Sequence, residues 1–155
     1  IIDVINPNNK AGRITLICRM GADNISAKLP TIISKVKKEG KKVVWACDPM
    51  HGNTIKAKTG YKTRPLKNII SEIEKFFHIH RSEGTYPGGI HLEMTGQDVT
   101  ECLGGLQEIQ ESDLKSRYHT YCDPRLNASQ ALELAFLLSD FLKDEKFSSK
   151  KSSNL

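Results

Sequence analysis

The sequence predicts an α/β fold in which parallel β-strands are joined by helices. Short apolar segments and amphipathic segments alternate four times along the chain, and the apolar segments lack the regular polar alternation of half-exposed strands. A closed barrel of this class needs eight strand-helix units in about 250 residues. Because the 155 residues supply four such units, we expect half of a (β/α)8 barrel.

A four-stranded doubly wound domain is the structural alternative. Its glycine-rich phosphate-binding fingerprint, GxGxxG, would follow the first strand, whereas this chain has Arg19, Met20 and Gly21 at that point. The sequence therefore favours the half barrel.

The composition is typical of one soluble domain. No apolar run approaches the roughly 18 to 20 residues that span a membrane, and no signal segment opens the chain. The chain begins with Ile1 rather than methionine, so we expect its true N-terminus to be missing or processed. The net charge of +5 lies largely on lysines of one predicted helix and of the tail, which indicates a solvated surface. The four cysteines form no CxxC pair, which predicts reduced thiols in a cytosol-like compartment.

The first half of the chain predicts two strands and two helices. Residues 13–18 form a strand after a turn-rich opening, and Asp23 or Asn24 caps a helix that stops at Gly40. Residues 43–46 form a buried strand, and a second amphipathic helix begins near Thr63. Helical spacing predicts that one face of the first helix points inward, with Ile25, Leu29, Ile32, Ile33 and Val36. In the second helix, the inward face carries Leu66, Ile69, Ile70, Ile73, Phe76 and Phe77, and the outward face carries Lys67, Glu72, Glu74 and Lys75.

The second half repeats the alternation. Residues 88–96 predict a third strand and residues 118–122 a fourth, with a helical or loop-helical segment over residues 100–111 between them. Asn127 and Gln130 resemble a capping box, from which a last helix runs to Lys143 with Leu132, Ala135, Phe136, Leu138 and Leu142 inward. Residues 1–145 would then be the barrel segment, and residues 146–155 a disordered Ser/Lys-rich tail.

Polar side chains stand where each of the four predicted strands ends, namely Arg19, His51, Glu93 and Asp123. The carboxyl ends of parallel strands meet at one rim, so we expect these side chains to converge. An imidazole with two carboxylates combines nitrogen and hard oxygen donors, which suits Mn²⁺, Co²⁺, Fe²⁺ or Zn²⁺. Any one of these residues alone, Asp123 above all, would more often be a polar strand end or a helix cap. Together they predict a divalent metal site.

Three longer motifs surround these residues: WACDPMHGNT at 45–54, GGIHLEMTGQDVTECLGG at 88–105 and YCDPRLN at 121–127. They closely resemble the class II (plant-type) 3-deoxy-D-arabino-heptulosonate 7-phosphate (DAHP) synthases. The resemblance runs over residues 13–143 but covers only the C-terminal part of a family enzyme, whose barrel is complete. It therefore implies the C-terminal half of a barrel enzyme. It also implies the condensation of phosphoenolpyruvate with erythrose 4-phosphate, which releases phosphate and opens the shikimate pathway to aromatic amino acids.

The resemblance also implies roles for individual residues. His51, Glu93 and Asp123 match the family's metal ligands, and the fourth ligand, a cysteine, would precede this chain. Arg19 matches an arginine that grips phosphoenolpyruvate, and a guanidinium fork suits that anion better than an ammonium does. Lys62 matches a lysine associated with erythrose 4-phosphate. Asp48, Arg64 and His91 are either supports of these groups or purely structural residues.

The expected cofactor is a divalent metal, Mn²⁺ or Co²⁺ first, with Zn²⁺, Fe²⁺ and Cd²⁺ as alternatives. The expected partners are the two small-molecule substrates, with no nucleic acid and no membrane. The intact protein is expected to be a homo-oligomer. Its expected location is the cytoplasm, or a plastid for a plant-type source. Two other functions stay open. One is a different metal-dependent barrel aldolase or hydrolase. The other is an inactive fragment or split subunit that needs an N-terminal half.

Overall fold

A parallel sheet of three strands in the order β1-β2-β5 lies at the centre of the computed structural model, which describes residues 1–152. Its strands are β1 (Thr15–Cys18), β2 (Val44–Cys47) and β5 (Pro87–Ile90). β1 and β2 pair in continuous register from Thr15 opposite Val44 to Cys18 opposite Cys47. The pairing of β2 with β5 shifts between Trp45 and Ala46. The predicted α/β class with parallel strands is confirmed.

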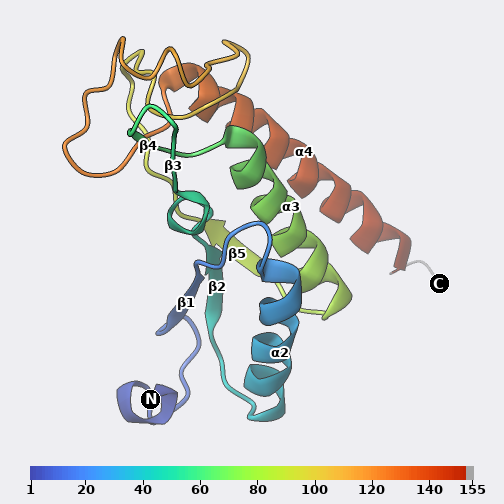
Figure 1. Ribbon diagram of the computed structural model, residues 1–155. Helices are drawn as coiled ribbons and strands as arrows, with labels where there is room; N and C mark the ends of the chain where they lie inside the picture. The colour runs from blue at the N-terminus through green and yellow to red at the C-terminus, as the bar shows by residue number, and fades with distance from the viewer. Residues whose placement is uncertain (153–155) are drawn as a thin grey trace.

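Three helices lie on one side of this sheet: α2 (Ile25–Lys38), α3 (Leu66–Ser82) and, packed beside α3, α4 (Ala128–Ser152) (Figure 1). The hydrophobic core lies between them and the sheet, where Cys18, Trp45 and Cys47 of the strands join the buried aliphatic and aromatic side chains of the helices. The opposite face of the sheet is open, and Ile17 and Val44 on it are 56% and 36% exposed.

The remaining elements are short. Helix α1 (Ile2–Ile5) occupies the opening that the sequence predicted to be turns. The 3-10 helix η1 (His51–Asn53) follows β2, and β3 (Ile55–Lys56) pairs with β4 (Lys62–Thr63) in an antiparallel hairpin that the sequence did not predict. Within residues 1–152, no helix is both long enough and apolar enough to cross a bilayer.

The predicted fourth strand does not form. Residues 118–122 are irregular, and residues 91–96 leave the sheet after Ile90, so a single parallel bridge between Met94 and Leu126 takes the place of a ladder. The N–H groups of His119 and Thr120 donate instead to the side chain of Glu101, which removes them from strand pairing. Residues 100–111, predicted to be helical or loop-helical, form turns with isolated bridges at Leu103, Gly104 and Ile109 and contain no helix.

Helix faces differ from the prediction at several positions. Glu72, expected outward, is completely buried. Helix α4 turns Leu134, Leu137, Leu138 and Phe141 toward the core and leaves Leu132, Phe136 and Leu142 exposed, and Ile32 of α2 is also exposed. The reason in α4 is that the helix touches the rest of the fold along one narrow stripe, where Phe141 lies against Phe77 with ring centroids 5.6 Å apart.

The predicted ends of the helices agree with the structure in position except at the C-terminus, but the predicted cap of α2 does not form: Asn24 precedes the helix without a side-chain cap hydrogen bond and donates instead to the carbonyl of Met20. α2 and α3 end as expected, and the Asn127 capping box forms, because the N–H of Gln130 donates to Asn127 Oδ1 at 2.9 Å and the N–H of Asn127 donates to Gln130 Oε1 at 3.2 Å. Helix α4 continues past Lys143 to Ser152, into the segment 146–155 predicted to be disordered. Residues 153–155 of that segment lie outside the described residues.

The cysteines are all free thiols. Cys18, Cys47 and Cys102 are buried, and Cys122 is exposed. Burial raises the pKa of Cys18 to about 11 and that of Cys102 to about 12, so both stay protonated at neutral pH. The three buried thiols therefore act as small apolar groups.

Candidate metal centre

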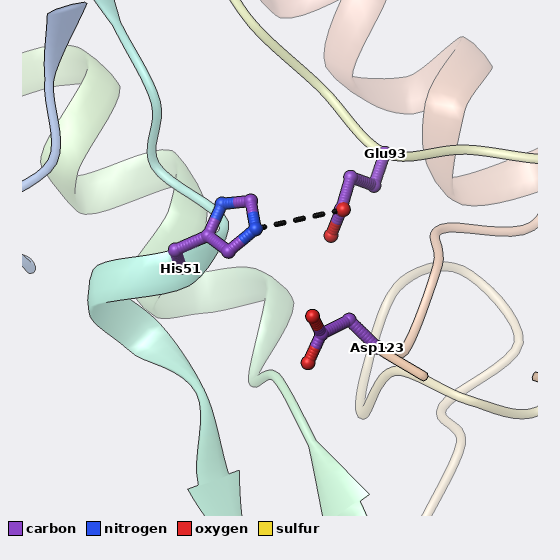
Figure 2. Close-up of side chains that lie close together, drawn as sticks. All are labelled: His51, Glu93 and Asp123. Atoms are coloured by element: carbon purple, nitrogen blue, oxygen red, sulfur yellow. Dashed lines mark ion pairs between the residues drawn. The ribbon is translucent and has the colours of Figure 1, made fainter. Parts of the chain in front are cut away.

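His51, Glu93 and Asp123 come together above the carboxyl ends of the strands. His51 opens η1 after β2, Glu93 follows β5, and Asp123 lies in the irregular segment before α4. Figure 2 shows the three side chains pointing toward one another, and one ligand atom of each lies within 4.8 Å of the other two. The distance from His51 Nε2 to Glu93 Oε1 is 3.5 Å. The structure thus brings together the three residues that the sequence predicted as metal ligands.

Asp48 fixes the orientation of the His51 ring. Its buried carboxylate accepts a hydrogen bond from His51 Nδ1 at 2.7 Å and others from the N–H groups of Met50 and His51 at 3.0 and 3.2 Å. Burial alone would raise the pKa of Asp48, but these hydrogen bonds offset it and the pKa lies below its ordinary value. The proton of neutral His51 therefore sits on Nδ1, and the lone pair of Nε2 faces Glu93 and Asp123.

Each carboxylate of the centre is paired with a cation from the end of the β3–β4 hairpin. Arg64, fully buried, donates through Nη1 to Glu93 Oε2 and to the carbonyl of Pro124, and through Nε to Thr54 Oγ1 at 2.9 Å. Lys62 Nζ lies 3.1 Å from Asp123 Oδ1, and this ammonium holds the pKa of Asp123 below its ordinary value. Both cations stabilise the ionised carboxylates that a divalent metal requires.

Arg19 is held beside this centre by Asp48, the aspartate that also orients His51. Its Nε donates to Asp48 Oδ2 at 3.1 Å while 56% of its side chain is exposed. His91, in contrast, is exposed, and within the described residues only its backbone N–H has a partner, the carbonyl of Cys47. The structure brings Asp48 and Arg64 to the predicted ligands but not the side chain of His91.

Two further buried polar residues, Glu72 and Asn53, tie together the loops that follow β1 and β2. Glu72 Oε1 accepts the N–H groups of Met20 and Gly21 at 3.1 and 2.9 Å, and its Oε2 accepts Asn53 Nδ2 at 2.7 Å. Asn53 Oδ1 in turn accepts the N–H of Ala22 at 3.0 Å. The loop that carries Arg19 is thereby held to the loop that carries His51.

Sequence reasoning missed this role of Glu72, although a signal was present. Position 72 lies three residues after Ile69 and four before Phe76, on the apolar face of α3. A carboxylate on that face needs donors to offset its burial, which raises its pKa. Asn53 and Glu101, also buried and polar, carried no comparable signal.

The same two loops touch at a pair of glycines. A Cβ on Gly21 would lie 2.7 Å from the carbonyl oxygen of Gly52, and one on Gly52 would lie 2.8 Å from Gly21 Cα. Gly21 also has a φ of +84°, which favours glycine. The approach of the Arg19 and His51 loops therefore depends on both residues lacking a side chain.

The donor set fits a divalent transition metal. One imidazole nitrogen and two carboxylates match the mixed preferences of Mn²⁺, Co²⁺, Fe²⁺ and Zn²⁺, and they leave coordination positions open for a further ligand and a substrate oxygen. Among the described residues, no cysteine belongs to this cluster.

The comparisons with known proteins agree with the motifs. The model of the class-II DAHP synthetase family matches residues 1–139. The phospho-2-dehydro-3-deoxyheptonate aldolase AroG of Mycolicibacterium smegmatis is 54% identical over 143 residues, which cover 92% of this chain and 31% of that protein. The phospho-2-dehydro-3-deoxyheptonate aldolase of Streptomyces coelicolor is 52% identical over 144 residues, 93% of this chain and 32% of that protein. This chain thus spans about a third of the length of these curated relatives. The resemblance stated from the motifs is confirmed, and the chain belongs to the class-II DAHP synthetase family.

Proposed function

We propose that the protein to which this chain belongs condenses phosphoenolpyruvate with erythrose 4-phosphate and water to give DAHP and phosphate, as the first step of the shikimate pathway. The observation that carries the proposal is the convergence of His51, Glu93 and Asp123 in a chain of this family. The curated relatives bear names of the same activity, phospho-2-dehydro-3-deoxyheptonate aldolase.

The architecture that fits this activity is a closed barrel of which this chain forms the C-terminal half. Three features support it. The strands are parallel, the helices cover only one face of the sheet, and the open face carries the exposed apolar side chains of Ile17 and Val44. The remaining strands, and a cysteine as the fourth metal ligand, would come from the two thirds of the relatives' length that this chain does not span. This chain joined to that part is the full-length enzyme.

In this proposal, His51, Glu93 and Asp123 hold the metal, with Mn²⁺ or Co²⁺ expected first and Zn²⁺, Fe²⁺ or Cd²⁺ as alternatives. A bound divalent metal supplies Lewis-acid polarisation of the aldehyde oxygen of erythrose 4-phosphate. Arg19 binds the phosphate or carboxylate of phosphoenolpyruvate with its Nη groups, while Asp48 holds its Nε. Lys62 binds the phosphate of erythrose 4-phosphate. Held in this way, C3 of phosphoenolpyruvate faces the aldehyde carbon.

The test is a coupled assay on the full-length enzyme. DAHP formation and phosphate release should be equimolar with both substrates present, should stop when a chelator removes the metal, and should return with Mn²⁺. A different metal-dependent barrel aldolase would use metal but would not release phosphate from this pair of substrates. That outcome would refute the proposed reaction.

A cytoplasmic location is proposed with it, in keeping with four free thiols. The alternative plastid location and a homo-oligomeric state stay predictions from the sequence.

A further inference from the structure

The segment that carries Asp123 is held in place without a strand. Residues 118–125 make no ladder with the sheet, yet they place Asp123 beside His51 and Glu93. After Asp123, the N–H of Leu126 donates to the carbonyl of Glu93 at 3.0 Å, which ties this side of the segment to the neighbouring ligand. At Asp123 itself, Lys62 Nζ lies 3.1 Å from Oδ1, and Arg64 Nη1 donates to the carbonyl of Pro124. Residues 119, 120 and 125 make further contacts.

The side chain of Glu101 provides most of these remaining contacts. Its Oε1 accepts the N–H groups of His119 and Thr120 at 3.1 and 2.9 Å, and its Oε2 accepts the N–H of Arg125 at 2.8 Å. The Arg125 guanidinium adds Nε to Oε2 at 3.0 Å and Nη2 to Oε1 at 2.8 Å. One carboxylate thus binds the chain on both sides of Asp123.

The environment of Glu101 makes this arrangement strong. The side chain has no exposed surface, so its five donors replace water completely. Burial alone would raise the pKa of Glu101, but the hydrogen bonds from Arg125 and from the backbone offset it, and the pKa lies below its ordinary value. Hydrogen bonds from several donors to an ionised acceptor are stronger than neutral ones.

We propose that Glu101, braced by Arg125, is a positioning residue that sets Asp123 as a metal ligand by closing the segment 119–125 around its own carboxylate. Glu101 does not touch the metal centre: its effect passes through the backbone of residues 119–125. The inference rests on the proposed function, because it assumes that Asp123 binds the metal.

The isosteric change Glu101→Gln isolates this role. It keeps the size and shape of the side chain but replaces one acceptor oxygen with an NH₂ group, which would face N–H donors of either His119 and Thr120 or Arg125. The segment must then shift, and Asp123 with it. Loss of a group that orients a metal ligand typically weakens metal binding by about 10- to 100-fold.

The experiment measures the Mn²⁺ dissociation constant of the full-length enzyme by calorimetry, together with its melting temperature without metal. Glu133→Gln is the matched control, because Glu133 also accepts a loop N–H, that of Leu106 at 3.0 Å, but that loop carries no ligand. We expect Glu101→Gln to raise the Mn²⁺ dissociation constant about 10- to 100-fold. Saturating Mn²⁺ should restore most of the turnover of this variant. Glu133→Gln should change neither the Mn²⁺ dissociation constant nor the turnover.

A purely structural role would lower the melting temperature of Glu101→Gln but leave the Mn²⁺ affinity of the folded protein within about threefold of the parent, and this result would overturn the inference. If Glu101→Gln fails to fold, Arg125→Lys replaces it, since it keeps the carboxylate and the backbone donors but removes the fork. That variant should weaken Mn²⁺ binding by several-fold, and unchanged binding would equally overturn the inference.

His51→Ala, measured beside them, distinguishes failure of the proposed metal site from failure of the proposed role of Glu101. If it keeps Mn²⁺, the metal site itself is wrong. If it loses Mn²⁺ while Glu101→Gln retains it, only the role of Glu101 fails.

Discussion

Asp48 links the two chemical functions of the site at the level of single residues. Its Oδ2 accepts both Arg19 Nε and His51 Nδ1, so one buried carboxylate orients the proposed substrate-binding guanidinium and the proposed metal ligand. Because both donors share one acceptor, a change in the position of either side chain is passed to the other. Phosphoenolpyruvate and the metal are therefore expected to bind at a fixed distance from each other.

Arg19→Lys tests the substrate side of this link. Lysine keeps the charge but loses the planar fork that can hold Asp48 with one nitrogen and an anion with two others. We expect binding of phosphoenolpyruvate to weaken by about 1.5 to 3 kcal/mol, the range for hydrogen bonds to charged groups. The measurement is the Michaelis constant for phosphoenolpyruvate in the full-length enzyme, with Mn²⁺ content as the second readout, which should be unchanged. The exposed Arg117 offers the control Arg117→Lys, and equal Michaelis constants in both variants would argue against the role of Arg19.

His80 gives the fold a pH dependence that is separate from the site. Its ring is buried against Trp45 and Phe76, with centroids 5.3 and 4.4 Å away, and its Nδ1 lies 2.7 Å from Thr85 Oγ1. Burial lowers the pKa of His80 to about 4, from 6.5 in the unfolded chain. The unfolded state therefore binds a proton first as the pH falls.

The free energy of unfolding should be highest above pH 6.5 and should fall as the pH drops from 6.5 toward about 4, by up to about 3 kcal/mol from this residue. Denaturant titrations at several pH values would measure this slope in the full-length enzyme, in His80→Leu and in His78→Leu. His78 is exposed on the same helix and is the control. The slope should decrease in His80→Leu alone, and a slope that is equal in all three proteins would contradict this explanation.

At the level of elements, the site depends on loops that are joined to one another by hydrogen bonds and backbone contacts, as well as to the strands that they follow. Glu72 and Asn53 join the loops after β1 and β2 through side-chain hydrogen bonds, and the glycines at 21 and 52 let the two backbones touch. Strand pairing ends at Cys18 and Cys47, so the geometry beyond these residues comes from this fastening.

Gly52→Ala should force these loops apart. The added Cβ would meet the backbone of Gly21, which cannot move aside as a flexible side chain can, so we expect a loss of about 1 to 3 kcal/mol in stability. Weaker Mn²⁺ binding should accompany it, because His51 precedes Gly52 directly. Thermal unfolding and Mn²⁺ titration are the measurements. Gly96→Ala is the control, since nothing lies within 4 Å of its added Cβ. If both variants behave alike, the contact between the glycines does not matter for the site.

The sequence predicted those elements whose signals are local. The strand before Arg19, the helix that stops before Gly40 and the Asn127 capping box rest on apolar periodicity and on caps, and they appear in the structure. The strand predicted at 118–122 does not, because its N–H groups are taken by a carboxylate about twenty residues earlier, a contact that no local pattern reveals. The convergence of His51 and Glu93 could be predicted since both follow parallel strands that end at one rim. Asp123 was expected there on a fourth strand, but it reaches the other two residues from an irregular segment. The fastening by Glu72, Asn53 and Glu101 could not, because it depends on tertiary burial.

At the level of the whole molecule, the described sheet is open at β1 and β5 and on one face. An exposed edge offers unpaired N–H and C=O groups, and exposed Ile17 and Val44 add apolar surface, so both features favour association. The chain made alone is therefore expected to be inactive and either to self-associate or to depend on the N-terminal half of the barrel. In the second case, mixing it with a separately made N-terminal half should restore activity. Sedimentation velocity and phosphate release would test this, and a stable monomer that turns over both substrates unaided would refute the half-barrel proposal.

His51, with Glu93 and Asp123, is proposed to hold the catalytic metal of a class-II synthase. The most direct measurement is the Mn²⁺ content of the full-length enzyme and of His51→Ala after identical loading and desalting, with DAHP formation measured on the same samples. His78→Ala serves as the control, because that histidine is exposed on α3. We expect the parent and His78→Ala to retain stoichiometric Mn²⁺ and activity, and His51→Ala to lose both together. Stoichiometric Mn²⁺ with normal turnover in His51→Ala would contradict the proposed metal site.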